Sequence, residues 1–398
     1  MPSAASFTVP ERVLMGPGPS GAHPTVLRAM TAPLLGHLDP DFLQIMDECR
    51  VMLREVLRTE NEHTLATPGT GTSGMEAAVM NIVEPGDRVV VGINGYFGER
   101  IAQMAERAGG EVTRVQFPWG SPVDAEELRR AIQAAGNVKL AAVVHAETST
   151  GAQTPIEPIS QIAHEAGALL LVDCVTSLGG VPVEVDAWGA DAVYSGTQKC
   201  LSAPPGVAPV SVSNAAWEKI RAREVPCNTF YLDLQLLEAY WGEQRVYHHT
   251  APISMVYALH QALQLVLNEG LEARWERHER NGRALQEGLQ ALGLSLHADE
   301  GYRLPVLTTV RIPDGVNDAE VRGKLLHEHG IEIGGGLGEL KGKVWRIGLM
   351  GESSTPGNVF LALSALARVL REQGFAADMR AALDAAAARL DRPLRTNS

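Results

Sequence analysis

The middle of the chain alternates between short apolar runs and segments whose apolar residues recur at helical spacing. The apolar runs predict strands at 88–93, 112–117, 139–146, 168–175, 192–195 and 207–212. Helices are expected between several of them, at 98–108, 124–135 and 158–166. Such alternation is typical of a mostly parallel sheet covered by helices, so the pattern predicts an α/β fold.

The flanking regions follow other patterns. Before the alternating part, helices are expected at 25–32, 41–57 and 72–83, and the Thr/Ser start and Glu76 of the last suggest a capped amino end. From residue 251 long helical patterns take over. A second region then mixes strands (308–312, 344–349) with helices (318–329, 356–373), and a terminal helix is expected from 376 that frays beyond Arg392.

With 398 residues, the chain exceeds the roughly 250–300 residues at which a single core stops growing. We therefore expect an arm rich in proline and glycine over residues 1–20, a large domain over 21–268 and a smaller C-terminal α+β domain over 269–398.

Net charge, hydropathy and cysteine content exclude several classes of partner and site. The net charge of −13 argues against nucleic acid and anionic membranes as partners, and no apolar run approaches the ~18–20 residues that span a bilayer. The four cysteines are scattered without metal-ligand spacing, and the adjacent His248 and His249 would point apart on a strand, so no metal site is expected. Without a signal-peptide pattern or a peroxisomal tail, a cytoplasmic location is expected.

Two residues at predicted strand ends suggest chemistry. Lys199 follows the strand that ends near Tyr194, and Asp173 lies at the carboxyl end of the strand before it. Ligands of open α/β sheets bind beyond these ends, and a lysine with an aspartate there suits pyridoxal phosphate (PLP). Taken singly, Lys199 could be a surface lysine and Asp173 a loop residue. The small polar flank 195–198 and the rigid 203–206 favour a buried lysine with a lowered pKa.

The segment 69–74 (Gly-Thr-Gly-Thr-Ser-Gly) matches the dinucleotide fingerprint, but its context argues against it. The preceding segment contains Pro68 and is a poor strand, and the acidic residue expected about 20 positions on is missing. A phosphate cradle at a helix amino end and a plain helix cap are the two other interpretations, of which the cradle is favoured.

Arg346 lies inside an apolar predicted strand, so it needs a partner. A bidentate guanidinium suits a substrate carboxylate, and an internal salt bridge is the alternative. The glycine-rich segment 334–338 suggests a flexible turn or a close backbone approach.

Together these segments resemble a known family. The motifs are LMGPGPS at 14–20, EPGD at 84–87, NG at 94–95, HAETSTG at 145–151, LVDCV at 171–175, SLGG at 177–180, YSGTQK at 194–199, APPG at 203–206, YHHT at 247–250, GGLG at 335–338 and RIG at 346–348. In this order they resemble the class V, fold-type I PLP aminotransferases, specifically the alanine–glyoxylate and serine–glyoxylate (serine–pyruvate) enzymes.

The resemblance implies a large domain with a mostly parallel, seven-stranded type of sheet and a role for each matching residue. Lys199 would form the Schiff base, Asp173 would pair with the pyridine nitrogen, and Arg346 would bind the substrate carboxylate beside the backbone at Gly18. The remaining residues implied to bind the cofactor are Thr70, Gly71, Thr72, Phe97, Thr148, Val175, Gln198, Tyr247 and Thr250. The last two reach the neighbouring subunit's phosphate in this family, which implies a homodimer with shared sites.

Three positions depart from the animal alanine–glyoxylate pattern: Phe97 replaces a tryptophan, Thr148 a serine and Thr72 a histidine. The expected reaction is ping-pong transfer of an amino group from alanine or serine to glyoxylate, with Lys199 moving the α-proton. No second obvious arginine is present for a distal carboxylate, which favours small amino acid and 2-oxo acid substrates. A serine–pyruvate enzyme, a desulfurase-like lyase and a non-catalytic relative are the alternatives, together with an NAD-binding dehydrogenase, which the missing acidic residue disfavours. No cysteine follows Cys227, which argues against a desulfurase.

Overall fold

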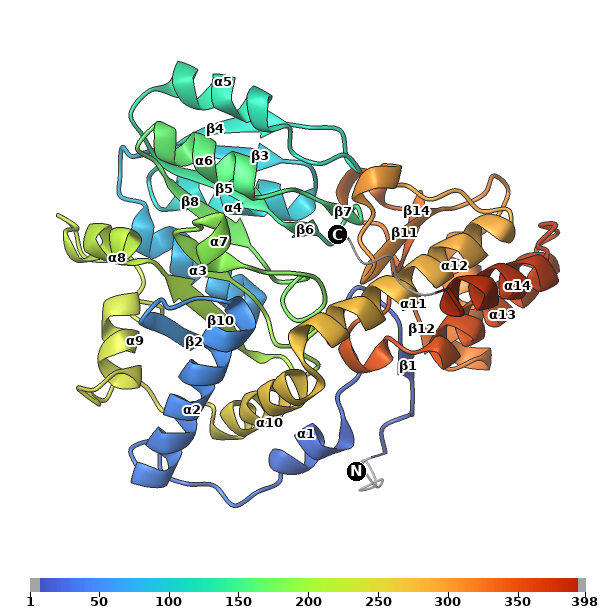
Figure 1. The fold of residues 1–398 in the computed structure, drawn as a ribbon, viewed down its shortest axis with the longest axis horizontal. Coiled ribbons are helices and arrows are strands. Elements are labelled where there is room, and N and C mark those ends of the chain that lie inside the picture. The colour runs from blue at the N-terminus through green and yellow to red at the C-terminus, as the bar shows by residue number, and fades with distance from the viewer. Residues whose placement is uncertain (1–7, 393–398) are drawn as a thin grey trace, which may run out of the picture.

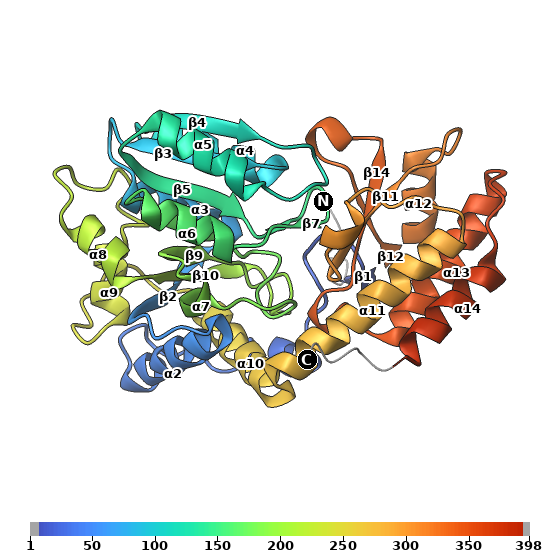
Figure 2. The same cartoon turned by 45° about the horizontal axis from the view of Figure 1, so that its top comes forward.

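The computed structural model describes residues 8–392, whose buried apolar side chains form two large clusters. One cluster contains residues between Phe42 and Leu271, and the other contains Met15 and residues between Ala284 and Ala386. The two parts lie side by side, and α10 (Ile253–Glu269) and α11 (Leu271–Ala291) run from one to the other (Figures 1 and 2).

Within residues 8–392, the first cluster surrounds a sheet of seven strands in the order β2-β10-β9-β8-β5-β3-β4. Only β10 runs antiparallel to its neighbours. In chain order these strands are β2 (His63–Gly69), β3 (Arg88–Ile93), β4 (Glu111–Gln116), β5 (Val138–Val144), β8 (Leu169–Asp173), β9 (Ala192–Tyr194) and β10 (Gly206–Val212). The central strands are buried on both faces, which explains their continuous apolar sequences.

Helices cover this sheet, with α3 packed on α4 and α5 on α6. Most begin where the helical periodicity predicts, and several are capped by an aspartate or serine side chain. Their bounds are α1 (Pro24–Ala29), α2 (Pro40–Leu57), α3 (Gly71–Ile82), α4 (Tyr96–Arg107), α5 (Ala125–Ala135), α6 (Glu157–Glu165), α7 (Val185–Trp188), α8 (Asn214–Arg221) and α9 (Leu234–Trp241). A short hairpin of β6 (Ala146–Glu147) and β7 (Ala152–Gln153) follows β5.

The interpretation of the segment before Gly69 as a poor strand was wrong. Residues His63–Gly69 form β2, and Pro68 is paired with Val207 of β10. Because β2 lies at the edge of the sheet, it has a neighbouring strand on one side only. A proline, which lacks a backbone N–H, is tolerated in such a strand.

The C-terminal part contains a second small sheet, in the order β11-β14-β13, covered by helices. Its elements are β11 (Leu307–Arg311), α12 (Asp318–Glu328), β12 (Ile331–Glu332), β13 (Gly334–Gly335), β14 (Val344–Gly348), α13 (Pro356–Glu372) and α14 (Met379–Leu390). The terminal helix begins three residues later than 376, and the fraying expected beyond Arg392 lies outside the described residues. The N-terminal arm joins this part, because β1 (Val13–Leu14) pairs with β12. None of the described helices is both long and apolar enough to cross a membrane.

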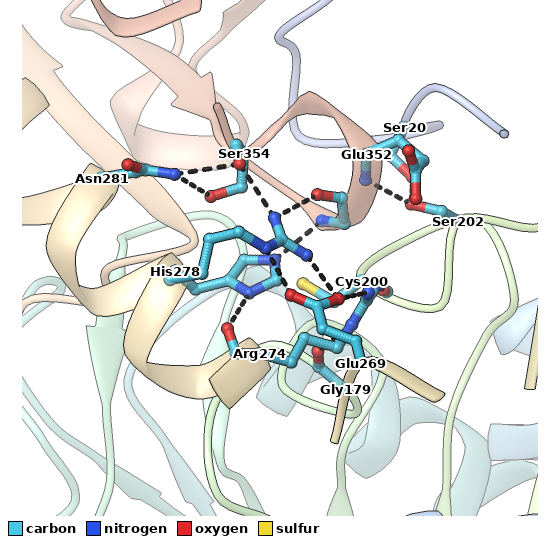
Figure 3. A network of polar contacts seen from close by, with 12 residues as sticks. Ser20, Gly179, Cys200, Ser202, Glu269, Arg274, His278, Asn281, Glu352 and Ser354 are labelled. Carbon is cyan, nitrogen blue, oxygen red and sulfur yellow. Dashed lines mark hydrogen bonds and ion pairs between the residues drawn. The ribbon is translucent and has the colours of Figure 1, made fainter. Parts of the chain in front are cut away.

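A polar network ties the two parts together where α11 begins (Figure 3). The Arg274 guanidinium donates to the carbonyl oxygens of Gly179 and Cys200, at 2.9 and 2.6 Å. One turn later, the ring of His278 accepts a hydrogen bond from the Gly351 N–H, at 2.8 Å. The network therefore links the segment after Lys199 to the loop that follows β14.

Candidate active site

Lys199 lies in the turn after β9, at the carboxyl edge of the central sheet. Its side chain is 9% exposed, and burial lowers the pKa of the amine to about 8. The Nζ atom donates to the carbonyl oxygen of Pro17 in the N-terminal arm. The structure therefore places this lysine in the interior with a lowered pKa, as its flanking sequence predicts.

The arm closes directly over this lysine. Gly18 has a φ of +112°, and a Cβ at this position would lie 2.6 Å from Nζ. Ser20 fixes the adjoining backbone, because its N–H donates to the Gln198 carbonyl and its hydroxyl to the Lys199 carbonyl, at 2.8 and 2.6 Å. A side chain at residue 18 would displace the amine.

Asp173 ends β8 and is only 3% exposed. The Tyr194 hydroxyl donates to Oδ2 at 2.7 Å, and the Val175 N–H donates to Oδ1 at 2.8 Å. Burial raises the pKa of this carboxyl to about 7, although both hydrogen bonds oppose the shift. A cation such as a protonated pyridine nitrogen would stabilise its ionised form. The contact from Tyr194 was not predicted, although a tyrosine that ends the strand beside Asp173 is a signal for it.

The amino end of α3 is open, so the cap predicted there was wrong. Thr70 is the N-cap residue but its side chain makes no capping hydrogen bond, and the Ser73 hydroxyl donates to the Thr70 carbonyl. At Gly71, a Cβ would lie 3.0 Å from a methyl group of Val175. The amide oxygen of Gln198 is buried without a hydrogen-bond partner among the described residues. The uncapped helix amino end fits a phosphate group, and Gln198 would contribute to it through its NH₂ group, because its unpaired oxygen can only accept.

Phe97 and Thr148 lie on neighbouring elements. Phe97 is in the first turn of α4 and is half-buried. Thr148 follows β6, is 4% exposed, and shares a hydrogen bond with the Thr176 hydroxyl. The two residues place an aromatic ring and a hydroxyl near the sheet edge that carries Asp173.

Arg346 projects from β14 and is 6% exposed. Its guanidinium donates to two carbonyl oxygens, those of Gly335 at 2.8 Å and Thr148 at 3.2 Å. No carboxylate of the described residues forms a salt bridge with it, so the alternative of an internal salt bridge was wrong. Burial lowers its pKa to about 10. The Glu147 carboxylate acts on it electrostatically without direct contact. A buried cation with no carboxylate in salt-bridge contact suits an anionic ligand.

Tyr247 and Thr250 do not join this group within one chain. Both are exposed on the connection between α9 and α10, and the Tyr247 ring lies 5.1 Å from the ring of His37. Their expected role toward the phosphate of a neighbouring subunit stays a prediction.

Comparisons with known proteins agree with this geometry. Residues 25–340 match the family model of the class-V aminotransferases. An alanine–glyoxylate aminotransferase from Nostoc sp. superimposes with a TM-score of 0.91 and 52% identity, over 93% of this chain and 98% of that one. The ureidoglycine–glyoxylate aminotransferase from Bacillus subtilis gives 0.95 and 41%, over 98% and 100%. The alanine–glyoxylate aminotransferase of Callithrix jacchus is 40% identical over 92% of this chain and 89% of its own length. The chain therefore belongs to the class-V aminotransferases, which have the PLP fold type I and use pyridoxal phosphate.

Proposed function

We propose that this protein transfers the amino group of a small amino acid to glyoxylate, giving glycine. The observation that carries the proposal is Arg346, a buried guanidinium held by two carbonyl groups beside the amine of Lys199. It can bind the one carboxylate that the donor and glyoxylate share. Glyoxylate is also named for the similar enzymes of Nostoc sp. and Bacillus subtilis.

Other residues of the site would bind the cofactor. The open end of α3, at Thr70, Gly71 and Thr72, would hold the cofactor phosphate together with Gln198. Asp173 would keep the ring nitrogen protonated. When bound, the cofactor supplies an electron sink for the bond that breaks at the substrate Cα.

Three side chains would act around the ring and the substrate. Phe97 and Val175 would enclose the ring, and Thr148 would offer its hydroxyl to the ring's oxygen. Lys199 would take the proton from the substrate Cα and later return it, and a lowered pKa leaves part of its amine neutral for this purpose.

The amino donor differs among the relatives: one from Bacillus subtilis is an (S)-ureidoglycine–glyoxylate transaminase, and that of Callithrix jacchus is an alanine–glyoxylate aminotransferase. We propose alanine or serine, because both carry a single carboxylate and a short side chain. Serine–pyruvate transfer is the second possibility within the same chemistry.

We further propose a cytoplasmic homodimer. The four cysteines are free thiols, which fits a reducing compartment. Large apolar side chains are exposed around the connection that carries Tyr247, with Phe230 at 73% and Val246 at 52% exposure. Such surface is typical of subunit contacts.

The test is to supply the PLP-loaded protein with ¹³C-labelled glyoxylate and L-alanine, L-serine or (S)-ureidoglycine, and to measure labelled glycine by mass spectrometry. We expect glycine with alanine or serine. If labelled glycine forms only with ureidoglycine, the proposed donor is wrong. If it forms with none of the three donors, the proposed acceptor is wrong. Lys199→Ala is the control, because turnover retained in that variant would contradict the assignment of the site.

A further inference from the structure

The helix that carries Phe97 has no cap of its own. Its N-cap residue, Gly95, has no side chain to accept hydrogen bonds from the first turn of α4. The N–H groups of such a turn need partners, particularly where the turn packs against the protein interior.

These N–H groups are instead satisfied by the last residue of β6 and the turn that follows it. Glu147 Oε2 accepts from the N–H groups of Phe97 and Gly98, at 3.2 and 3.4 Å. The Ser149 hydroxyl accepts from the Tyr96 N–H at 2.9 Å. A Cβ at Gly95 would overlap the Glu147 side chain, so the missing side chain of the N-cap residue makes room for this external cap.

Glu147 accepts hydrogen bonds at both of its carboxyl oxygens. It is 0% exposed, and Oε1 accepts from both the hydroxyl and the N–H of Ser149, at 2.6 and 3.0 Å. Burial raises its pKa, and the hydrogen bonds from Ser149, Gly98 and Phe97 oppose that shift. All four groups around it donate, so an uncharged amide at this position would turn an NH₂ group toward other donors.

The residue between the two caps contacts the substrate side of the site. The Thr148 carbonyl accepts from the Arg346 guanidinium, and the Thr148 hydroxyl bonds with Thr176. The three-residue segment 147–149 therefore contacts both the helix of Phe97 and the proposed carboxylate-binding arginine.

We propose that Glu147 is a positioning residue, which caps α4 from outside and so holds the Phe97 ring against the cofactor. The effect on the cofactor rests on the proposed function, whereas the cap itself does not.

The cap is tested on the cofactor-free protein by hydrogen exchange of the amides of residues 96–98. In Glu147→Gln we expect exchange at Phe97 and Gly98 to rise about tenfold or more, because a lost buried hydrogen bond exposes its partner. The matched control is Glu99→Gln on the same helix, where Glu99 is partly exposed and pairs with Arg114 at 3.2 Å. Unchanged exchange in Glu147→Gln, or an equal rise in both variants, would overturn the cap. If Glu147→Gln does not fold, Ser149→Ala decides, with faster exchange expected at Tyr96 and an unchanged rate contradicting the proposal.

The effect on the cofactor is tested by a double-mutant cycle read by visible circular dichroism of the bound cofactor. We expect Glu147→Gln to weaken the signal per bound cofactor in the wild-type background and to add little in the Phe97→Leu background, because both changes act through one ring. Equal effects in the two backgrounds would show that Glu147 does not act through Phe97. Neither readout requires turnover, so an inactive wild type would contradict the proposed function and leave this inference intact.

Discussion

At the scale of single residues, burial strongly disfavours the ionised form of Asp173. Its carboxyl ends a fully buried strand, and its pKa rises from the usual 3.8 to about 7. Well below pH 3.8 the group is neutral in both the folded and the unfolded chain. As pH rises from 3.8 through about 7, the unfolded chain ionises while the folded chain stays largely neutral, so stability is progressively lost. The residue therefore costs stability in the cofactor-free protein and is suited to a cationic partner.

Asp173→Asn tests this effect. The amide keeps the volume and an acceptor for the Val175 N–H, while the Tyr194 hydroxyl can turn to accept. In urea unfolding of the cofactor-free protein, we expect the variant to gain on the order of 1–4 kcal/mol over the wild type at pH 8, and much less at pH 4. The loaded variant should lose activity, because no carboxylate faces the ring nitrogen. A variant less stable than the wild type at pH 8 would show that the native carboxylate is already stabilised.

At the scale of elements, the start of α11 is held by one carboxylate. Glu269 forms ion pairs with Arg274 and Arg277, both at 2.5 Å, and the Arg274 side chain is 2% exposed. Arg277 donates to the carbonyl oxygens of Gly351 and Ser354, at 2.9 and 2.8 Å. The carboxylate therefore orients the two guanidinium groups that bind the two different parts of the molecule.

Glu269→Gln should destabilise the protein by about 1–3 kcal/mol, because it leaves the buried Arg274 guanidinium without its counter-charge. The loss is moderated because the Glu269 carboxylate itself is partly exposed. The measurement is urea unfolding at neutral pH. Glu279→Gln is the matched control on α11, since its pair with Arg283 is more exposed and should change stability by less than ~0.5 kcal/mol. Equal losses of unfolding free energy in the two variants would show that Glu269 stabilises the protein no more than an ordinary surface ion pair does.

At the scale of the whole molecule, Tyr247 and Thr250 lie outside the site of their own chain, on an exposed connection. If the protein is a homodimer, each site is completed by these residues of the partner. A dimer of two chains with different defects can then contain one intact site.

We therefore expect complementation between Lys199→Ala and the double variant Tyr247→Phe/Thr250→Ala. Each should be weakly active or inactive alone, and mixing them under conditions that exchange subunits should restore glycine formation. The mixed dimer has one site with the lysine of one chain and both phosphate contacts of the other. Light scattering checks the mass. A dimer that forms without restored activity would contradict shared sites, and a monomer that remains active would contradict the dimer.

Sequence periodicity determined most of the fold. The predicted strands and the main helices lie within a few residues of their predicted bounds, because long apolar runs have few ways to be buried, whereas the two-residue strands were not predicted. The strand β2 was missed because the rule against proline depends on whether a strand lies at the edge of a sheet, and only the strand order shows that. The proposed division near residue 268 stays a prediction.

The sequence by itself also indicated candidate site residues, since Lys199, Asp173 and Arg346 are polar residues within or shortly after apolar strands. Only the tertiary structure decided their partners. Residues far apart in the chain meet there: Pro17 covers Lys199, Thr148 holds Arg346, and Glu147 caps a helix fifty residues away. Hydrogen bonds and pKa shifts depend on these distances and on burial, and neither is a property of local sequence.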